Sequence, residues 1–171
     1  MQLEETPFNQ IPVMEINGIE VCQSLAIVRY IAQKYGFDCK TLLEDAKADM
    51  IAYSIIDMRR TFVTCVDLFE KDPEKLAANR KEYGEEVLPR WLGYLEKILE
   101  ENKEGEGYFV GDDLTWVDVS FMTYTDPDPY VKFAKIPFSL DAFPKLKALR
   151  HRVETDPRVA KWFEVAPKTD F

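Results

Sequence analysis

Gln23 and Ser24 are the residues whose position most directly suggests ligand chemistry. They stand where a short β-branched stretch ends and a helical repeat of apolar residues begins, which predicts a helix start. The first amides of a helix lack partners within the helix and carry a partial positive charge, so they bind carboxylates. Serine is also a preferred cap for its own helix. Ligand binding and self-capping both stay open at this point.

The other residue types with reactive side chains are sparse. Cys22, Cys39 and Cys65 are widely spaced and odd in number, which predicts neither a disulfide framework nor a zinc site. His151 is the single histidine of the sequence, so a site with several histidine ligands is excluded. We therefore expect no metal, and we expect a reducing compartment.

Composition narrows the class of protein further. The chain has 171 residues, 46% of them hydrophobic and 13% aromatic, which is typical of a packed domain. Its net charge of −9 argues against nucleic acid and anionic membranes as partners. The acidic N-terminal residues do not resemble a signal peptide, and no apolar run approaches the roughly 20 residues of a membrane span. We expect a cytoplasmic protein.

The elements that would position Gln23 and Ser24 can be predicted locally. Residues 12–16 and 19–22 read as two strands around Asn17-Gly18, a dipeptide typical of type I′ hairpin turns. A helix is expected from Ser24 until Gly36 stops it. A hairpin with one helix is too small to be stable alone, so it must dock on a larger body.

Apolar residues at helical spacing in the rest of the chain predict this larger body. Helices are expected over 41–69, 73–102, 116–124, 144–154 and 157–163, with a kink at Pro89. Thr115 and Asp118 form a capping box, which we interpret as structural. The sequence predicts a mainly α fold. Three tryptophans lie at spacings that predict core positions rather than ligand platforms: Trp91, Trp116 and Trp162.

Three stretches together resemble the cytosolic glutathione S-transferase family, with the sigma-like class as the nearest match. TPFNQIPVMEINGIEVCQSLAIVRYIAQKYG, starting at Thr6, is similar to the second half of that family's thioredoxin-like domain. YFVGDDLTWVDV, starting at Tyr108, resembles the capping-box segment of its helical domain. DAFPKLKALRHRVETDPRVAKWF, starting at Asp141, resembles its C-terminal helices. The resemblance implies residues 1–37 as a thioredoxin-like remnant and residues 38–171 as an all-helical domain.

The resemblance also implies a set of glutathione contacts. Ile11 would precede a cis Pro12 and pair its backbone with the cysteinyl part of glutathione, with Gln10 beside it. Gln23 and Ser24 would hold the γ-glutamyl carboxylate. A further contact, from Asp57, would reach across a homodimer to the glutathione amino group. Small hydrophobic electrophiles are the expected co-substrates.

The resemblance further implies that part of the small domain is missing. A strand–helix–strand unit needs about 30 residues, and eleven precede Pro12. We expect the first strand, the first helix, the second strand and the thiolate-stabilising tyrosine of sigma-like enzymes to be absent. No catalytic residue is therefore assigned. The enzyme interpretation predicts an impaired glutathione transferase or prostaglandin isomerase. The alternative is a non-enzymatic relative, either crystallin-like or a ligand-binding and interaction module.

Overall fold

A computed structural model describes residues 6–66, 70 and 72–167. In chain order the elements are β1 (Val13–Ile16), β2 (Ile19–Cys22), α1 (Ser24–Tyr35), α2 (Leu42–Cys65), α3 (Pro73–Glu82), the π-helical segment η2 (Tyr83–Val87), α4 (Leu88–Glu100), the 3₁₀ turn η3 (Lys103–Gly105), α5 (Trp116–Tyr124), the π-helical segment η4 (Pro129–Phe133), α6 (Pro144–Thr155) and α7 (Pro157–Val165). The predicted mainly α fold with one hairpin is confirmed. The predicted end of the helix at 69 lies outside the described residues.

The hairpin forms where the Asn-Gly signal predicts it. β1 and β2 pair antiparallel, with Val13 opposite Cys22. Asn17 and Gly18 have φ angles of 51° and 79°, the positive values that a type I′ turn requires. The helix α1 follows β2 almost directly, and it ends at Gly36, which is left-handed with a φ of 72°. Local chemistry therefore accounts for this whole unit.

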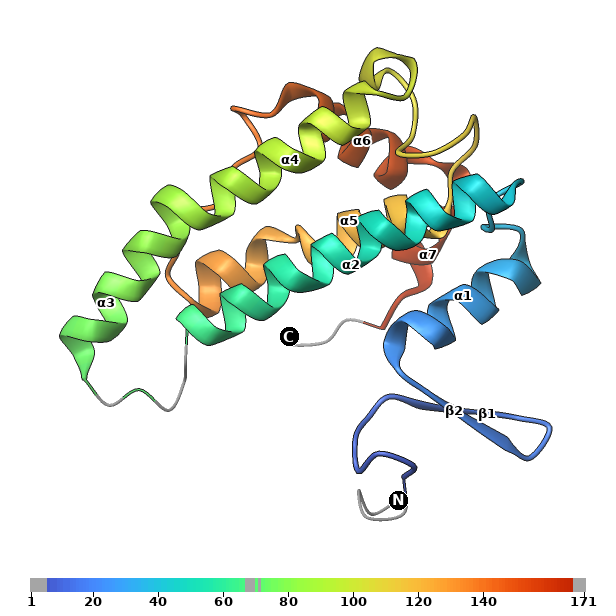
Figure 1. Ribbon diagram of the computed structural model, residues 1–171, viewed down its shortest axis with the longest axis horizontal. Coiled ribbons are helices and arrows are strands. Elements are labelled where there is room, and N and C mark those ends of the chain that lie inside the picture. The colour runs from blue at the N-terminus through green and yellow to red at the C-terminus, as the bar shows by residue number, and fades with distance from the viewer. Residues whose placement is uncertain (1–5, 67–69, 71, 168–171) are drawn as a thin grey trace.

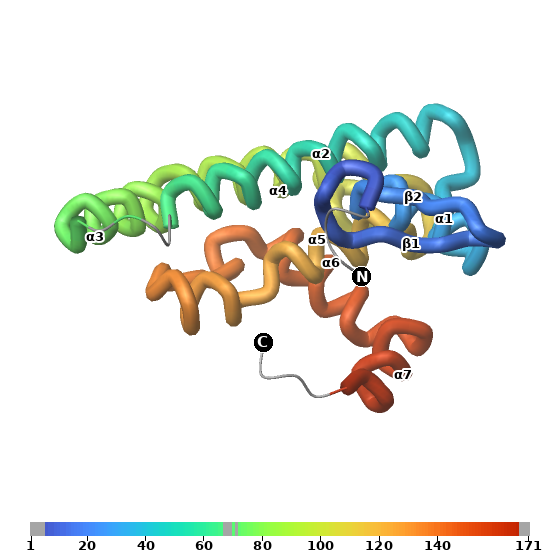
Figure 2. The backbone as a smooth tube through the Cα atoms, turned by 90° about the horizontal axis from the view of Figure 1, so that it is seen from below, coloured from blue at the N-terminus to red at the C-terminus, as the bar shows by residue number. Residues whose placement is uncertain are grey.

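Two layers of helices form the larger body (Figure 2). The long helix α2 lies against the rod made by α3 and α4, and α5 and α6 lie beneath them (Figures 1 and 2). The inner face of α2 is fully buried, with Ile51, Ile55 and Met58 at most 1% exposed. Leu92 and Leu95 of α4 are equally buried in the same core. The apolar residues that repeat with helical spacing in the sequence thus lie on the faces by which α2 and α4 pack against each other.

The predicted helix over 73–102 is interrupted rather than simply kinked. Asp72 caps α3 by accepting hydrogen bonds from the amides of Glu74 and Lys75, as an Asp-Pro start predicts. The backbone then widens into η2, where the amide of Leu88 bonds to the carbonyl of Tyr83. Pro89 follows at once and has no N–H to continue the regular ladder. The distortion therefore starts several residues before the proline.

The hairpin unit docks on the helical body through α1. Ala32 of α1 is 3% exposed and belongs to the common core. Arg29 pairs with Asp49 of α2 at 2.8 Å between Nη1 and Oδ2. Beyond α1, the amide of Trp116 donates to the carbonyl of Phe37 at 2.9 Å. These contacts place the start of α1 and the open end of the hairpin on one side of the molecule (Figure 1). None of the helices in the described ranges is long and apolar enough to span a bilayer.

Candidate functional site

The hairpin register brings two separate stretches of the predicted site together. β1 starts one residue after Pro12, and β2 ends one residue before Gln23. Because Val13 lies opposite Cys22, the Ile11-Pro12 and Gln23-Ser24 pairs are neighbours at the open end of the hairpin. The Ile11–Pro12 bond is cis, as the resemblance implies. The Ile11 residue is 75% exposed, so its backbone neighbourhood is open to a ligand.

Gln23 joins strand to helix in an unusual backbone conformation. Its φ and ψ angles are 72° and 117°. Positive φ at a residue other than glycine is sterically disfavoured and costs on the order of 1–3 kcal/mol, and such residues cluster at ligand sites. No local signal in the sequence marks Gln23 for this conformation. The strain is an observation that favours a functional role for the junction.

The start of α1 has no side-chain cap. Gln23 occupies the N-cap position without a capping hydrogen bond, and the first turn contains no acidic residue. The first helical hydrogen bond runs from the amide of Ile27 to the carbonyl of Gln23. The amides of Ser24, Leu25 and Ala26 precede that bond and point out of the helix start. Self-capping by Ser24 is thus not what the structure shows. Within the described ranges, the half-buried Ser24 hydroxyl has no hydrogen-bond partner.

Gln10 is held by the loop that leads into the hairpin. Its backbone amide donates to Oγ1 of Thr6 at 2.9 Å, and its side chain is exposed. Thr6 itself is 5% exposed. This contact fixes the chain immediately before Ile11 and leaves the Gln10 side chain accessible.

Asp57 lies apart from this cluster. It is on the outer face of α2, where its carboxylate pairs with Arg60 at 3.2 Å. No hydrogen bond or ion pair within the described residues joins it to the hairpin. Met50 and Tyr53, 51% and 61% exposed, lie along the same face of α2 at helical spacing. One chain therefore brings together five of the six predicted residues and leaves Asp57 on a separate exposed stripe.

The start of α5 shows the opposite arrangement. The Asp118 carboxylate accepts hydrogen bonds from the amide of Phe109 at 2.8 Å, and from the amide and hydroxyl of Thr115, both at 2.9 Å. The Asp118 side chain is completely buried. Desolvation raises the pKa of Asp118 to about 6, against the lowering effect of these hydrogen bonds. The structural interpretation of this capping box is confirmed.

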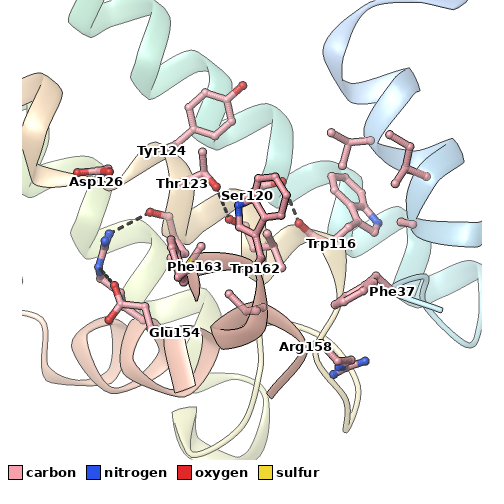
Figure 3. A pocket seen from close by; sticks show the side chains of 17 residues that line it. Phe37, Trp116, Ser120, Thr123, Tyr124, Asp126, Glu154, Arg158, Trp162 and Phe163 are labelled. Atoms are coloured by element: carbon pink, nitrogen blue, oxygen red, sulfur yellow. Dashed lines mark hydrogen bonds and ion pairs between the residues drawn. The ribbon is translucent and has the colours of Figure 1, made fainter. Parts of the chain in front are cut away.

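An apolar groove of about 830 Å³ was not predicted (Figure 3). It lies between α1, α5 and the last two helices, with Trp116 and Phe37 on one side and Glu154 on the other. Trp116 is 4% exposed, as predicted for a core residue, but Trp162 is 59% exposed and lines the groove. The core prediction for Trp162 is wrong, because α7 buries only its Val159 side against the bundle.

Trp91 is half-buried and packs edge-on against Tyr94. The prediction that Trp91 lies in the core therefore holds only in part. Over the part of the chain that the structure describes, no group of three or more potential metal ligands comes together.

Comparison with known proteins identifies the family. Residues 48–165 match the profile described as "Glutathione S-transferase, C-terminal domain". The profile for the N-terminal domain of the same enzymes matches residues 3–33. This chain belongs to the glutathione S-transferase family. Its two matched regions correspond to the hairpin unit and to the helical body described above.

Individual glutathione S-transferase relatives cover nearly the whole chain. A glutathione S-transferase of Plasmodium yoelii yoelii is 36% identical over 91% of this chain and 68% of its own length. S-crystallin SL11 of Nototodarus sloanii is 34% identical over 96% of this chain and 78% of its own length. The solved structure of prostaglandin synthase D of Nilaparvata lugens superposes with a TM-score of 0.81 at 26% identity, covering 98% of this chain and 79% of that one.

Proposed function

We propose that this chain binds glutathione at the open end of its hairpin, in a fold of the sigma-like glutathione S-transferase type. The observation that carries the proposal is the uncapped start of α1, which lies beside the Ile11-Pro12 pair. An open helix start is suited to a carboxylate, and an exposed extended backbone next to it is suited to a peptide. Glutathione presents both groups. In this proposal residues 1–37 form the glutathione-binding part and residues 38–171 the helical domain.

Each site residue has a stated role in this proposal. The amides of Ser24 and Leu25 and the Ser24 hydroxyl bind the γ-glutamyl carboxylate, with Gln23 beside it. Ile11 pairs its backbone with the cysteinyl residue in the manner of an added strand. Gln10 contacts the peptide from the adjoining loop. These contacts hold the backbone and the γ-glutamyl end of glutathione.

The reaction of the family requires glutathione as a thiolate. A free thiol has a pKa near 8.5, and lowering it by two units takes about 2.7 kcal/mol of differential stabilisation. The residues with proposed roles address the peptide and its γ-glutamyl end rather than the sulfur. We therefore propose that the 171-residue chain binds glutathione but conjugates it slowly to hydrophobic electrophiles. The prostaglandin isomerisation of some sigma-like members is the second reaction within this proposal.

A homodimer is the proposed assembly. The outer stripe of α2 carries exposed Met50 and Tyr53 beside the Asp57–Arg60 ion pair, a mixture of apolar and charged groups that is typical of protein interfaces. In a dimer built on this stripe, Asp57 would reach the glutathione amino group of the neighbouring chain. Sedimentation should show about twice the chain mass at micromolar concentration, and a monomer would contradict this part of the proposal.

Retention on immobilised glutathione followed by a conjugation assay tests the function. We expect retention that free glutathione reverses, and a conjugation rate for a halogenated nitrobenzene far below the rates typical of the family. Failure to be retained would overturn the binding proposal. Conjugation at rates typical of the family would show that another residue activates the sulfur.

A non-enzymatic role is the second candidate. The likeness to S-crystallin SL11 supports it, because a crystallin-like structural protein needs the fold without the catalytic group. A cytoplasmic location, in keeping with the three free thiols, fits either function. Retention on glutathione favours the ligand-binding interpretation, whereas a stable dimer that does not bind glutathione favours the structural one.

A further inference from the structure

A second cavity, of about 480 Å³, is lined by residues of α3 and η2. Figure 1 shows α3 at the opposite end of the molecule from the hairpin. One wall comes from α3 and η2, and the other comes from the segment that follows η4. Its lining residues are Ala77, Arg80, Lys81, Gly84, Glu85, Lys135 and Pro137. Nothing in the proposed glutathione chemistry uses these residues.

The cavity is cationic in an acidic protein. Among the described residues that line it, three side chains are basic and one is acidic, a local net charge of +2, whereas the whole chain carries −9. The lysines come from opposite walls, Lys81 from α3 and Lys135 from the segment after η4. Because an excess of positive charge in a cavity concentrates ions of the opposite sign, this arrangement favours a small anion.

Arg80 has an unmet hydrogen-bonding requirement. Its Nε atom is buried and has no hydrogen-bond partner, and no carboxylate in the described residues pairs with its guanidinium. The acidic neighbour, Glu85, lies 4.0 Å from Lys81 in an exposed ion pair rather than on Arg80. A buried donor without a partner is costly. The Arg80 guanidinium, which no carboxylate in the described residues neutralises, is the group of this cavity best suited to an external anion.

The walls of the cavity are held rigidly by the two π-helical segments. Tyr83 of η2 and Tyr130 of η4 are fully buried, with ring centroids 6.4 Å apart. The amide of Ile136 donates to the carbonyl of Tyr130 at 2.9 Å, which pins the second wall. A Cβ at Gly84 would lie only 3.0 Å from a methyl group of Ile136, so the walls approach closely here.

Lys135 is presented by this rigid wall in a strained backbone conformation. Its φ angle is 58°, a value that non-glycine residues adopt at a cost. Its ammonium group donates to the carbonyl of Lys132 at 2.7 Å and keeps further donors available. The Lys135 ammonium group is thus preorganised, so little ordering of this side chain remains to be done on binding.

We propose that this cavity binds the phosphate group of a small phosphate monoester. The local charge of +2 matches a phosphate dianion, and the flat arginine fork can donate two parallel hydrogen bonds to its oxygens. Lys81 and Lys135 would add point charges from either side. Ala77, Gly84 and Pro137 leave an uncharged surface for the organic group of the ester.

Binding of phenyl phosphate and of inorganic phosphate, followed through the backbone amide signals of Gly84 and Glu85 at low salt, tests this site. We expect saturable shifts, with phenyl phosphate binding more tightly than inorganic phosphate. Arg80→Gln should weaken binding by about tenfold or more, since a charge-assisted pair is lost. Arg90→Gln, an exposed arginine outside the cavity, removes the same charge and should weaken it less than about twofold.

The phosphate assignment would be overturned by shifts that do not saturate, by equal effects of Arg80→Gln and Arg90→Gln, or by benzoate binding as tightly as phenyl phosphate. Inorganic phosphate binding as tightly as phenyl phosphate would confine the site to the free ion and overturn the monoester assignment. Lys135→Asn keeps a residue that tolerates positive φ and should weaken binding by about threefold, which provides a test if Arg80→Gln fails to fold. Ser24→Ala should leave these shifts unchanged, which separates this site from the glutathione site.

Discussion

The starts of α1 and α5 are both suited to a carboxylate, but only α5 receives one from its own chain. The helix α1 follows strand β2 across the single residue Gln23, and α5 follows the extended residue Thr115. Each presents the partly positive end of a helix dipole. At α5 the chain supplies its own carboxylate, Asp118, and buries it. At α1 it supplies none, and the residue at the junction is strained. A helix start that the chain satisfies by itself supports the fold, whereas one that it leaves open is available to a ligand.

Removing the internal carboxylate should have the largest effect. Asp118→Ala leaves the buried amides of Phe109 and Thr115 without acceptors, so we expect the free energy of unfolding to fall by about 3 kcal/mol or more. Denaturant titration measures this change. The exposed Asp113→Ala should change it by less than about 1 kcal/mol. Similar effects of the two variants would remove the distinction between a buried cap and a surface charge.

The pH dependence of stability should report the same buried group. Asp118 has a folded pKa of about 6, above its ordinary value of 3.8, because burial penalises its charged form. A raised folded pKa means that this group's contribution to stability is fully present below pH 4 and is lost as the pH rises through 6. The unfolding free energy of the wild type should therefore fall relative to Asp118→Asn between pH 4 and 7. If the difference in unfolding free energy between the two proteins stays constant over this pH range, burial does not raise the pKa of Asp118.

The open helix start can be closed by one substitution. Ala26 is exposed and lies as far from Gln23 as Asp118 lies from Thr115. Ala26→Glu should supply an internal carboxylate to α1 and weaken glutathione binding by about tenfold or more through competition and repulsion. Ala26→Gln, the neutral control, should change affinity less than about threefold. Calorimetry measures both. Unchanged affinity in Ala26→Glu would mean that the ligand carboxylate binds elsewhere.

The smallest predicted effect concerns the Ser24 hydroxyl. Ser24→Ala removes one hydrogen bond to a charged but solvent-accessible group, so we expect glutathione affinity to fall about fivefold without a change in unfolding free energy above about 0.5 kcal/mol. Ser54→Ala on α2 is the matched control and should leave affinity unchanged. A loss of stability in Ser24→Ala with no loss of affinity would instead support a structural role for this serine.

Local sequence chemistry predicted the parts of the fold that depend on neighbours in the chain. The Asn17-Gly18 turn, the Asp72 cap and the capping box at Asp118 all follow from hydrogen bonds made within a few residues. The positive φ of Gln23 and the exposure of Trp162 depend on how distant segments pack, and no short pattern encodes them. Helical periodicity likewise cannot distinguish an α-helical turn from the π-helical one at η2.

The same limit applies to the candidate site. Ser24 is suggested by its place at a helix start and Ile11 by resemblance, and the hairpin register explains why they are neighbours. The cationic cavity could not be predicted from the sequence, because its residues come from two segments about fifty positions apart. Arg80 and Lys135, each taken alone, look like ordinary surface charges. Sites of this kind become visible only when unpaired donors are counted in the folded chain.

Glutathione binding at the start of α1 is tested most directly by titrating the isotopically labelled chain with glutathione and following its backbone amide signals. We expect saturable shifts at Ser24, Leu25 and Ile11, no shift at Thr115 or Asp118, and loss of the Ser24 and Leu25 shifts in Ala26→Glu. Saturable shifts confined to other parts of the chain, with the start of α1 unmoved, would contradict binding at this helix start.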